Sequence, residues 1–243
     1  MIKRVKRRLR RQLLAARGYT EELDCQKSPV GLADGTWTLS TSLLGPDSVI
    51  YSVGVGTDIS FDLALIKQTG ATVHAFDPTP RSIEWIGEQS LPEKFKFYDY
   101  GLASFDGNLS FFVPRKQASA HYTPVKLEQG QSDSRRFEAP VFSLKTIMKN
   151  LGHQRLDLLK LDIEGGEYDV LRDILASQIE VDQLLIEFHH NYRSISFSKT
   201  KEALDSLREY GYRILHISDR TYEFSLLKQH CVTPLIQSQR AVL

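Results

Sequence analysis

Short apolar runs alternate with amphipathic segments along most of this chain. The runs are rich in β-branched and aromatic residues and end at Gly, Asp or other polar positions, which predicts strands. The segments between them repeat apolar residues at helical spacing. Strands are predicted at 36–40, 48–54, 71–77, 94–104, 156–164, 181–190, 212–218 and 221–229. Helices are predicted at 58–70, 79–89, 144–152, 166–177 and 198–211.

This order of elements predicts an α/β fold, a doubly wound and mostly parallel sheet with helices on both faces. The last two strands are joined by a link too short for a parallel crossover, so they are expected to form an antiparallel hairpin. The "DG" at 106–107 predicts a tight turn into a hairpin-like excursion. The polar, proline-containing stretch 114–140 predicts a long surface insertion.

The first 17 residues differ from the rest in charge. They hold eight of the 31 Lys and Arg residues and no acid, which leaves 23 basic against 30 acidic residues elsewhere, a net charge of −7. Apolar positions recur in this arm near helical spacing, at Ile2, Val5, Leu9, Leu13 and Leu14. We therefore expect a basic amphipathic helix and a connecting segment over 1–46, followed by the main domain over 47–243.

Such a basic helix has three readings. It can pack on the body as a solvated terminal element, or it can dock on an anionic membrane surface or an acidic partner. Nucleic-acid binding is not expected, because no aromatic residues are interleaved with the charges of residues 1–17.

Cysteine content and hydropathy bear on the compartment. Cys25 and Cys231 form no CxxC motif or Cys/His cluster, so a disulfide framework or zinc site is not expected. The arm has no long apolar core of a secretory signal, and no stretch approaches the roughly 20 apolar residues of a membrane span. We expect a cytoplasmic protein, with peripheral membrane attachment through residues 1–17 as the alternative.

A glycine-containing loop follows the first strand of the main domain. Gly54 and Gly56 in "YSVGVGTD" allow a tight turn and the close approach of a ligand. Asp77 ends the next strand, where an acid accepts hydrogen bonds from the ribose hydroxyls of an adenosine. The third position of the dinucleotide pattern is Ile59, which disfavours a pyrophosphate; S-adenosylmethionine has none. A plain strand-to-helix turn with a surface Asp is the alternative.

Four segments, "VIYSVGVGTDISFDLAL", "VHAFDPTP", "GLASFDGNLSFFV" and "LLKLDIEGGEYDVL", occur in this order. Together they resemble the FkbM-type S-adenosylmethionine-dependent methyltransferases, over about residues 47–228. The K-x-D-I-E-G-x-E string at 160–167 is the most specific part. The resemblance implies the class I methyltransferase fold and O-methylation of a hydroxyl, typically on a sugar or a glycosylated natural product.

The resemblance also implies cofactor-binding positions. Related methyltransferases often carry an acid two positions before the first glycine, where this chain has Ser52. Ser52 would accept a hydrogen bond from the methionine amine more weakly, and Asp58 is the candidate to supply the missing charge. The peptide at Gly101–Leu102 matches the position that lines the adenine ring.

Polar side chains gather where two neighbouring strands are expected to end. Asp162 and Glu164 end the strand 156–164, and Glu187 and His189 end the strand 181–190. The carboxyl ends of parallel strands form the ligand crevice of such folds, so these four residues are the candidate catalytic residues. Glu167 falls in the first turn of the next helix, where a carboxylate stabilises the helix dipole.

The chemistry of this cluster is open at the level of sequence. His189, with an ordinary pKa near 6.5, would take the proton of the acceptor hydroxyl. Alternatively, Asp162, Glu187 and His189 would hold a divalent cation such as Mg²⁺ that lowers the pKa of the hydroxyl. Purely structural roles are the third reading.

Two other functions remain in competition with methyl transfer. One is a nicotinamide-dependent oxidoreductase, which Ile59 and the terminal hairpin disfavour; the other is a non-catalytic adaptor of methyltransferase fold, which Ser52 keeps open. The acceptor is expected to be a hydroxyl-bearing small molecule or glycan. Cations of the 114–140 segment are expected either to help shape its pocket or to be merely solvated: Arg115, Lys116, His121, Arg135 and Arg136.

Overall fold

The computed structural model describes residues 2–112, 122–124 and 136–232, except for the side chains of residues 2–6 and 34. Its helices are α1 (Ile2–Ala16), α2 (Ser60–Thr69), α3 (Pro80–Gly87), α4 (Leu144–Leu151), α5 (Glu167–Ala176) and α6 (Phe197–Glu209). Short 3₁₀ turns lie at Ala33–Gly35 and Thr41–Leu43. The strands are β1 (Ser28–Val30), β2 (Trp37–Leu39), β3 (Val49–Val53), β4 (Thr72–Phe76), β5 (Phe95–Tyr98), β6 (Gly101–Leu102), β7 (Gly107–Phe112), β8 (Arg136–Phe142), β9 (Leu156–Leu161), β10 (Val181–Glu187), β11 (Tyr212–Ile217) and β12 (Glu223–Lys228).

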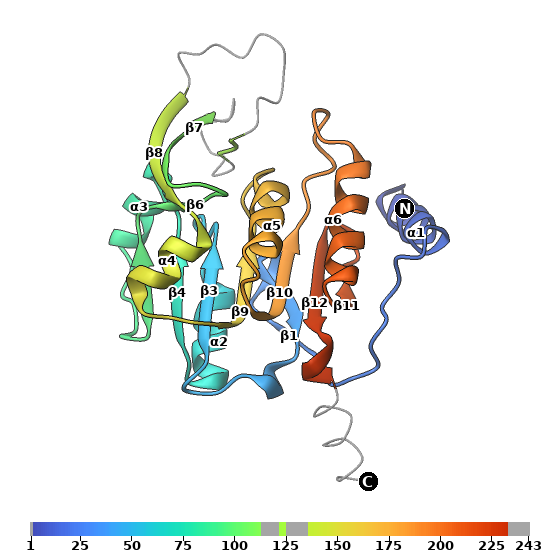
Figure 1. Cartoon of the computed structure of the whole chain (residues 1–243), viewed down its shortest axis with the longest axis horizontal. Helices are drawn as coiled ribbons and strands as arrows, with labels where there is room; N and C mark the ends of the chain where they lie inside the picture. The colour runs from blue at the N-terminus through green and yellow to red at the C-terminus, as the bar shows by residue number, and fades with distance from the viewer. Residues whose placement is uncertain (1, 113–121, 125–135, 233–243) are drawn as a thin grey trace.

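A seven-stranded sheet forms the centre of the molecule, with the strand order β11-β12-β10-β9-β3-β4-β5 (Figure 1). The strands β5, β4, β3, β9 and β10 pair in parallel. The strand β12 runs antiparallel to both β10 and β11. The predicted doubly wound sheet with an antiparallel terminal hairpin is therefore confirmed, and β9 lies between β3 and β10 as expected.

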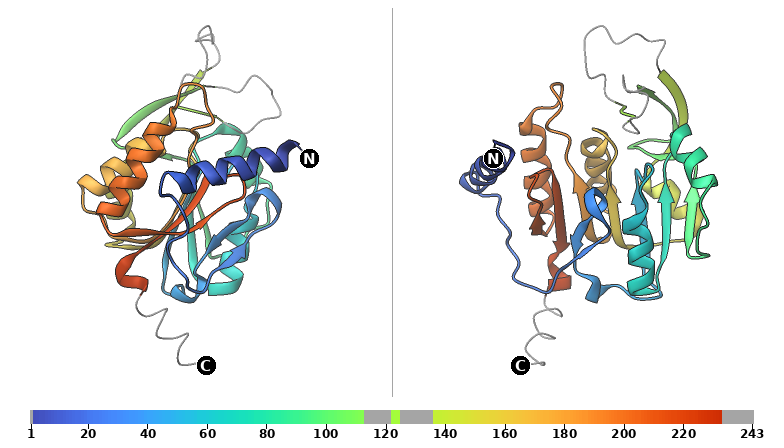
Figure 2. Two further views of the ribbon diagram at one scale, coloured as in Figure 1. Left: turned by 90° about the vertical axis from the view of Figure 1, so that its right-hand side faces the viewer. Right: turned by 180° about the vertical axis from the view of Figure 1, so that it is seen from behind.

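Both faces of this sheet are covered, because its central strands are apolar on both sides. One face packs against α4, α5 and α6 through residues such as Leu159 and Leu161. The other face packs against α2, β1 and β2 through residues such as Ile50 and Leu158, and against α3. Figure 2 shows these two layers from the side and from behind.

A second sheet of three strands, in the order β6-β8-β7, stands above the carboxyl ends of the parallel strands (Figure 1). The predicted single strand at 94–104 is wrong, because it breaks into β5 of the large sheet and β6 of the small one. The excursion after Gly107 does not pair with the strand before it; β7 pairs with the distant β8. The predicted surface insertion 114–140 is wrong over residues 136–140, which belong to β8; Phe137, Ala139 and Val141 alternate there as a strand would.

The predicted basic helix is present as α1 and lies outside both helical layers, beside α6 and the β11–β12 hairpin (Figures 1 and 2). The segment after it is fixed by Tyr19, whose hydroxyl donates a 2.7 Å hydrogen bond to Asp205 of α6. In the part of the chain that the structure describes, no helix combines the length and apolar character needed to cross a bilayer.

Candidate functional site

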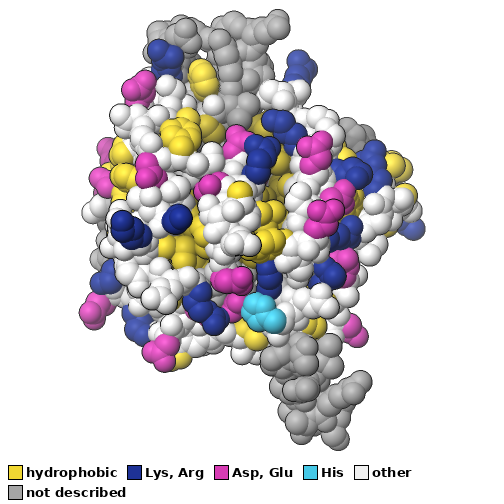
Figure 3. Space-filling model, in the orientation of Figure 1, with side chains coloured by type: hydrophobic (Ala, Val, Ile, Leu, Met, Phe, Trp, Pro, Cys, Tyr) yellow, Lys and Arg dark blue, Asp and Glu magenta, His cyan; other side chains and the backbone are white. Residues whose placement is uncertain are grey.

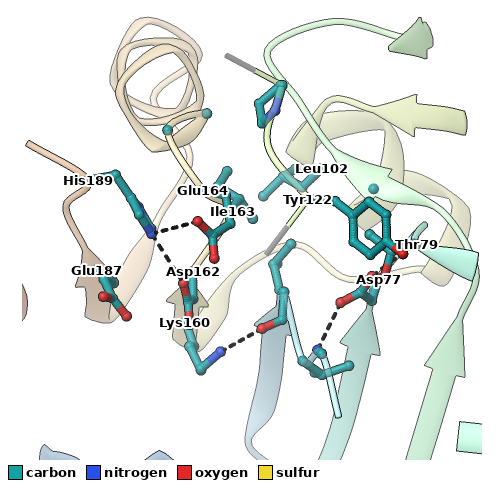
Figure 4. A pocket seen from close by; sticks show the side chains of 18 of the residues that line it. Asp77, Thr79, Leu102, Tyr122, Lys160, Asp162, Ile163, Glu164, Glu187 and His189 are labelled. Carbon is teal, nitrogen blue, oxygen red and sulfur yellow. Dashed lines mark hydrogen bonds and ion pairs between the residues drawn. The ribbon is translucent and has the colours of Figure 1, made fainter. Parts of the chain in front are cut away.

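A cavity of about 830 Å³ opens where the strands β3, β4, β9 and β10 end. Its wall includes the glycine loop after β3, the segment around Asp77, the β6 strand and the polar clusters that follow β9 and β10 (Figure 4). All of the sequence-predicted site residues except Ser52 line this one cavity. The candidate site residues thus gather at the carboxyl edge of the sheet, where the sequence indicated they would.

The two glycines of the loop after β3 do different things. Gly54 has φ +78°, and a Cβ there would lie 1.8 Å from the Asp162 carbonyl oxygen, so this glycine lets two loops touch. Gly56 has φ +57°, but a Cβ there would meet nothing within 4 Å. Gly54 is therefore required by packing, whereas Gly56 leaves space at the cavity wall.

Asp77 is buried at the end of β4 and holds the glycine loop in place. Its Oδ2 accepts a 2.9 Å hydrogen bond from the Gly56 N–H. Its Oδ1 accepts hydrogen bonds from the Thr79 N–H at 2.9 Å and from the Thr79 hydroxyl at 2.6 Å. The carboxylate is thus oriented before any ligand arrives, at the position predicted for a ribose-binding acid.

Asp62, in the first turn of α2, is a cavity residue that sequence reasoning missed. It is 2% exposed, and burial raises its pKa to about 6, although the Lys160 cation and the Ser52 hydroxyl oppose the shift. Asp62 Oδ1 and the Ser52 hydroxyl are both buried and near enough to influence each other, but among the described residues neither atom makes a hydrogen bond of normal geometry. Asp58, the predicted source of charge, is instead exposed and accepts a hydrogen bond from the Ser60 N–H at the start of α2.

The signal for Asp62 was its helical phase. Ile59, Leu63 and Ile66 recur at helical spacing; in the structure Ile59 is buried, and Leu63 and Ile66 are partly buried against the core. The helix also buries Phe61, Asp62 and Leu65, so its covered surface is wider than those three positions indicate. A carboxyl group on the buried face of a helix is costly unless it has a partner, which makes its presence informative.

Gly101 and Leu102 of β6 form another part of the cavity wall, as predicted for an adenine-lining peptide. A Cβ at Gly101 would lie 3.1 Å from both Pro78 and Val141, so a larger residue would require these side chains to shift slightly. Of the predicted loop cations, Arg136 is exposed on β8 and does not line the cavity. The others, Arg115, Lys116, His121 and Arg135, lie outside the described residues.

The second part of the site is a cluster of acids around His189 (Figure 4). His189 Nε2 lies 3.4 Å from Glu164 Oε2 and 3.8 Å from Asp162 Oδ1. Its Nδ1 lies 3.4 Å from Glu167 Oε1, which also accepts a 2.9 Å hydrogen bond from the His189 backbone N–H. Glu167 Oε2 accepts a further hydrogen bond from the Gly165 N–H at 2.9 Å.

Glu167 therefore does more than the predicted stabilisation of a helix start. It is fully buried and connects the turn after β9 to the residue that follows β10. The turn itself is sharp, since Glu164 and Gly165 have φ values of +54° and +106°. A positive φ is unfavourable for a glutamate, so the surrounding contacts must hold Glu164 in this conformation.

These acids change the protonation of His189. Burial lowers its pKa, but the hydrogen bond and charge of Glu167 and the charges of Glu164 and Asp162 outweigh burial and raise the pKa to about 10. The imidazole is therefore a cation at neutral pH, and the expectation of an ordinary pKa near 6.5 is not met. A cationic His189 has no lone pair with which to take a proton or bind a metal.

The pKa values of two carboxyl groups in the cavity, those of Glu187 and Asp162, are also raised. Burial raises the pKa of Glu187 to about 7, helped by the charges of Asp162 and Glu223 and opposed by His189 and Arg220. Burial also raises the pKa of Asp162, against the opposing charges of Lys160 and His189. Asp162, Glu187 and His189 thus share one cavity as predicted, but Glu187 rather than the histidine is suited to accept a proton near pH 7.

The ligand atoms of Asp162, Glu164 and His189 lie within 4.8 Å of one another, close enough to hold a metal ion. Glu187, which the sequence prediction included in such a site, is not part of this group. Tyr192 was missed altogether: its hydroxyl donates to Glu164, and its ring lies 5.1 Å from that of His189. It directly follows the predicted strand end in "HHNY", which was its signal.

The model of the FkbM methyltransferase domain matches residues 48–214. The chain is 22% identical over 193 residues to a probable methyltransferase-like protein 24 of Homo sapiens, covering 75% of this chain and 46% of that protein. It is 27% identical over 147 residues to the hexuronic acid methyltransferase AglP of Haloferax volcanii, covering 59% of this chain and 56% of that protein.

The chain therefore spans about half the length of the curated relatives it matches. Among solved structures, it is similar to a methyltransferase FkbM from Methylobacillus flagellatus, with a TM-score of 0.46 and 14% identity over 76% of this chain and 44% of that chain. It is also similar to a fibrillarin from Methanococcus jannaschii, with a TM-score of 0.44 and 11% identity over 84% of this chain and 83% of that chain.

Proposed function

The chain belongs to the FkbM methyltransferase family, and we propose that it transfers the methyl group of S-adenosylmethionine to a hydroxyl group of a sugar or glycan. One observation carries this proposal. A single cavity joins a glycine loop and ribose-type acid to a second cluster with two carboxyl groups of raised pKa, Asp162 and Glu187. The name of the hexuronic acid methyltransferase relative supports a sugar as acceptor.

The residues around the glycine loop and Asp77 fit S-adenosylmethionine. Asp62 is a buried carboxyl group with an oxygen that has no hydrogen-bond partner in the described part of the chain, which suits an ammonium group. Asp77 is positioned for ribose hydroxyls, and Gly101 with Leu102 supplies an apolar wall for the adenine. In this proposal Asp62 takes the role first considered for Ser52 and Asp58.

When bound, S-adenosylmethionine supplies an electrophilic methyl group on a sulfonium ion. The acidic cluster supplies the complementary chemistry, because a hydroxyl must lose its proton as it becomes methylated. Glu187 or Asp162 accepts that proton, since both have raised proton affinity and line the cavity. His189 remains protonated between Glu164, Asp162 and Glu167 and fixes their orientation.

A divalent cation at Asp162, Glu164 and His189 is the competing way to activate the hydroxyl. Metal binding would require His189 to lose its proton, and the same carboxylates that hold this proton would also attract the cation, so the two compete for one position. We propose that the proton occupies this position and that a carboxylate accepts the hydroxyl proton.

The experiment that tests the function combines calorimetry with a methyl-transfer assay. Calorimetry with S-adenosylmethionine and with a nicotinamide cofactor should give binding of the former alone. Radiolabelled methyl transfer should then be found with hexuronic acids or their glycosides, and Asp162→Asn with Glu187→Gln should lose it while cofactor binding persists. Glu202→Gln, on the exposed side of α6, is the matched control. Failure to bind S-adenosylmethionine would favour the adaptor reading; binding of a nicotinamide cofactor would favour the oxidoreductase.

A further inference from the structure

The helix α1 presents its leucines to solvent. Leu9 and Leu13, one turn apart, are 53% and 54% exposed, whereas Leu14 is 4% exposed. Residues four apart lie on the same face of a helix, so Leu9 and Leu13 form one exposed apolar stripe. A surface helix of a globular protein normally turns its apolar stripe toward the core, which α1 does not do.

The face of α1 that contacts the body is instead partly basic. Arg10, Leu14 and Arg17 follow helical spacing on this face. The Arg10 guanidinium lies 5.0 Å above the Tyr222 ring, and that of Arg17 lies 4.7 Å above the Phe197 ring. Each arginine thus gains a cation–π contact with the body.

Ion pairs fix the same orientation. Arg11 lies 3.3 Å from Glu21 and 3.4 Å from Asp219 of the β11–β12 turn. Arg10, Arg11 and Arg17 contact the body only through exposed pairs, each of which contributes little to stability, whereas Leu14 is buried. All four contacts favour the orientation that leaves Leu9 and Leu13 exposed.

The positive charge beside the Leu9–Leu13 stripe indicates what kind of surface covers it. Arg7 and Arg8 are exposed on α1 next to Leu9, and residues 1–17 contain no acid. In Figure 3, basic and hydrophobic side chains lie side by side at the right-hand edge, where Figure 1 places α1. A helix with leucines beside arginines suits the boundary between acyl chains and negatively charged headgroups.

We propose that α1 docks this protein on an anionic lipid bilayer, with Leu9 and Leu13 inserted at the level of the headgroups. The inference is independent of the proposed reaction. It has a consequence for the site, because Asp219 and Tyr222, which hold α1, flank Arg220 at the cavity wall. Docking would bring this side of the cavity near the lipid surface.

Vesicle flotation of the full chain tests the proposal. The protein should float with vesicles of phosphatidylcholine containing 30% phosphatidylserine and not with vesicles of phosphatidylcholine alone. Leu9→Gln with Leu13→Gln should lower the partition coefficient at least tenfold, and Arg7→Gln with Arg8→Gln should lower it several-fold. Leu32→Gln removes an exposed leucine outside α1 and should change nothing.

Circular dichroism and thermal unfolding establish that each variant is folded. Equal flotation of the leucine variant and the unaltered protein would overturn the proposal, as would absence of binding to the anionic vesicles. The molar mass in solution tests whether a second copy of the chain covers the stripe instead. A dimer that becomes a monomer when Leu9 and Leu13 are changed would show this and overturn lipid docking.

Discussion

Glu167 and His189 are 22 residues apart in the chain, yet one carboxylate oxygen of Glu167 serves both the backbone N–H and the ring of His189. The other oxygen holds the Gly165 N–H. Glu167 thus sets the position of the histidine and the charge that it carries. It lines no part of the cavity itself, so we regard it as a positioning residue.

Glu167→Gln should lower activity at least tenfold and lower the pKa of His189. Among the groups that raise the pKa of His189, Glu167 has the largest effect, and the amide of glutamine carries no negative charge. The amide is also a weaker hydrogen-bond acceptor for the buried N–H groups of His189 and Gly165. Stability should fall by about 1–3 kcal/mol. NMR titration of His189, with Glu202→Gln as control, measures the shift; an unchanged titration would contradict the positioning role.

Activity should rise with pH through about 7, because Glu187 accepts a proton only when it is ionised. Its folded-state pKa is raised, so its contribution to stability is fully present below the ordinary value of 4.5 and is lost as pH rises toward 7. Activity and stability should therefore change in opposite directions over this range. A profile of kcat/KM that keeps the same limb in Glu187→Gln would assign the base to Asp162.

Asp62→Asn should weaken S-adenosylmethionine binding by about tenfold to a hundredfold, as expected for loss of a charged hydrogen bond of about 1.5–3 kcal/mol. Asp58→Asn is the matched comparison on the same segment and should have little effect, because Asp58 is exposed. Calorimetry measures both. Equal losses of affinity in the two variants would show that Asp58 of the loop contributes as much to cofactor binding as Asp62 of the helix.

Chelation should leave activity unchanged. The acids around His189 keep it protonated, and a protonated imidazole cannot bind a metal ion. The assay compares the protein after dialysis against EDTA with the same protein supplied with Mg²⁺ or Mn²⁺. A loss that the cations restore would show that a metal replaces the proton on His189.

Gly54→Ala should be far more damaging than Gly56→Ala. Both positions have positive φ, which costs about 1–2 kcal/mol for alanine. At Gly54 the new methyl group would also collide with the Asp162 carbonyl, adding an overpacking cost of roughly 1–3 kcal/mol. Thermal unfolding of the two variants measures the difference, and equal losses would show that the contact between the loops can relax.

Much of the architecture followed from periodicity. The helices and strands of the large sheet repeat apolar residues in a way that local sequence reveals, and the capping glycine Gly70 ended α2 as expected. The small sheet could not be predicted from periodicity, because β8 contains Pro140 and pairs with strands that are distant in sequence. Strand partners at long range leave no mark on a single sequence beyond their alternation.

The site was predictable in its membership but less so in its chemistry. Strand order alone brought Asp162, Glu187 and His189 into one cavity. The pKa of His189 depends on Glu167, which reaches it from the first turn of a helix, and on the sharp turn that aims Glu164 inward. The role of Asp62 depends on how much of the surface of α2 is covered. None of these three arrangements can be derived from the spacing of residues along the chain.

The contacts of α1 also set when it can be fixed in place. Phe197, Asp219 and Tyr222, which hold its arginines, all lie in the last quarter of the sequence. A ribosome adding roughly 5–20 residues per second would need about 10–40 s after making α1 to deliver them. The helix α1 is therefore made well before the residues that fasten it, and during that interval its basic, leucine-bearing surface is accessible to membranes and chaperones.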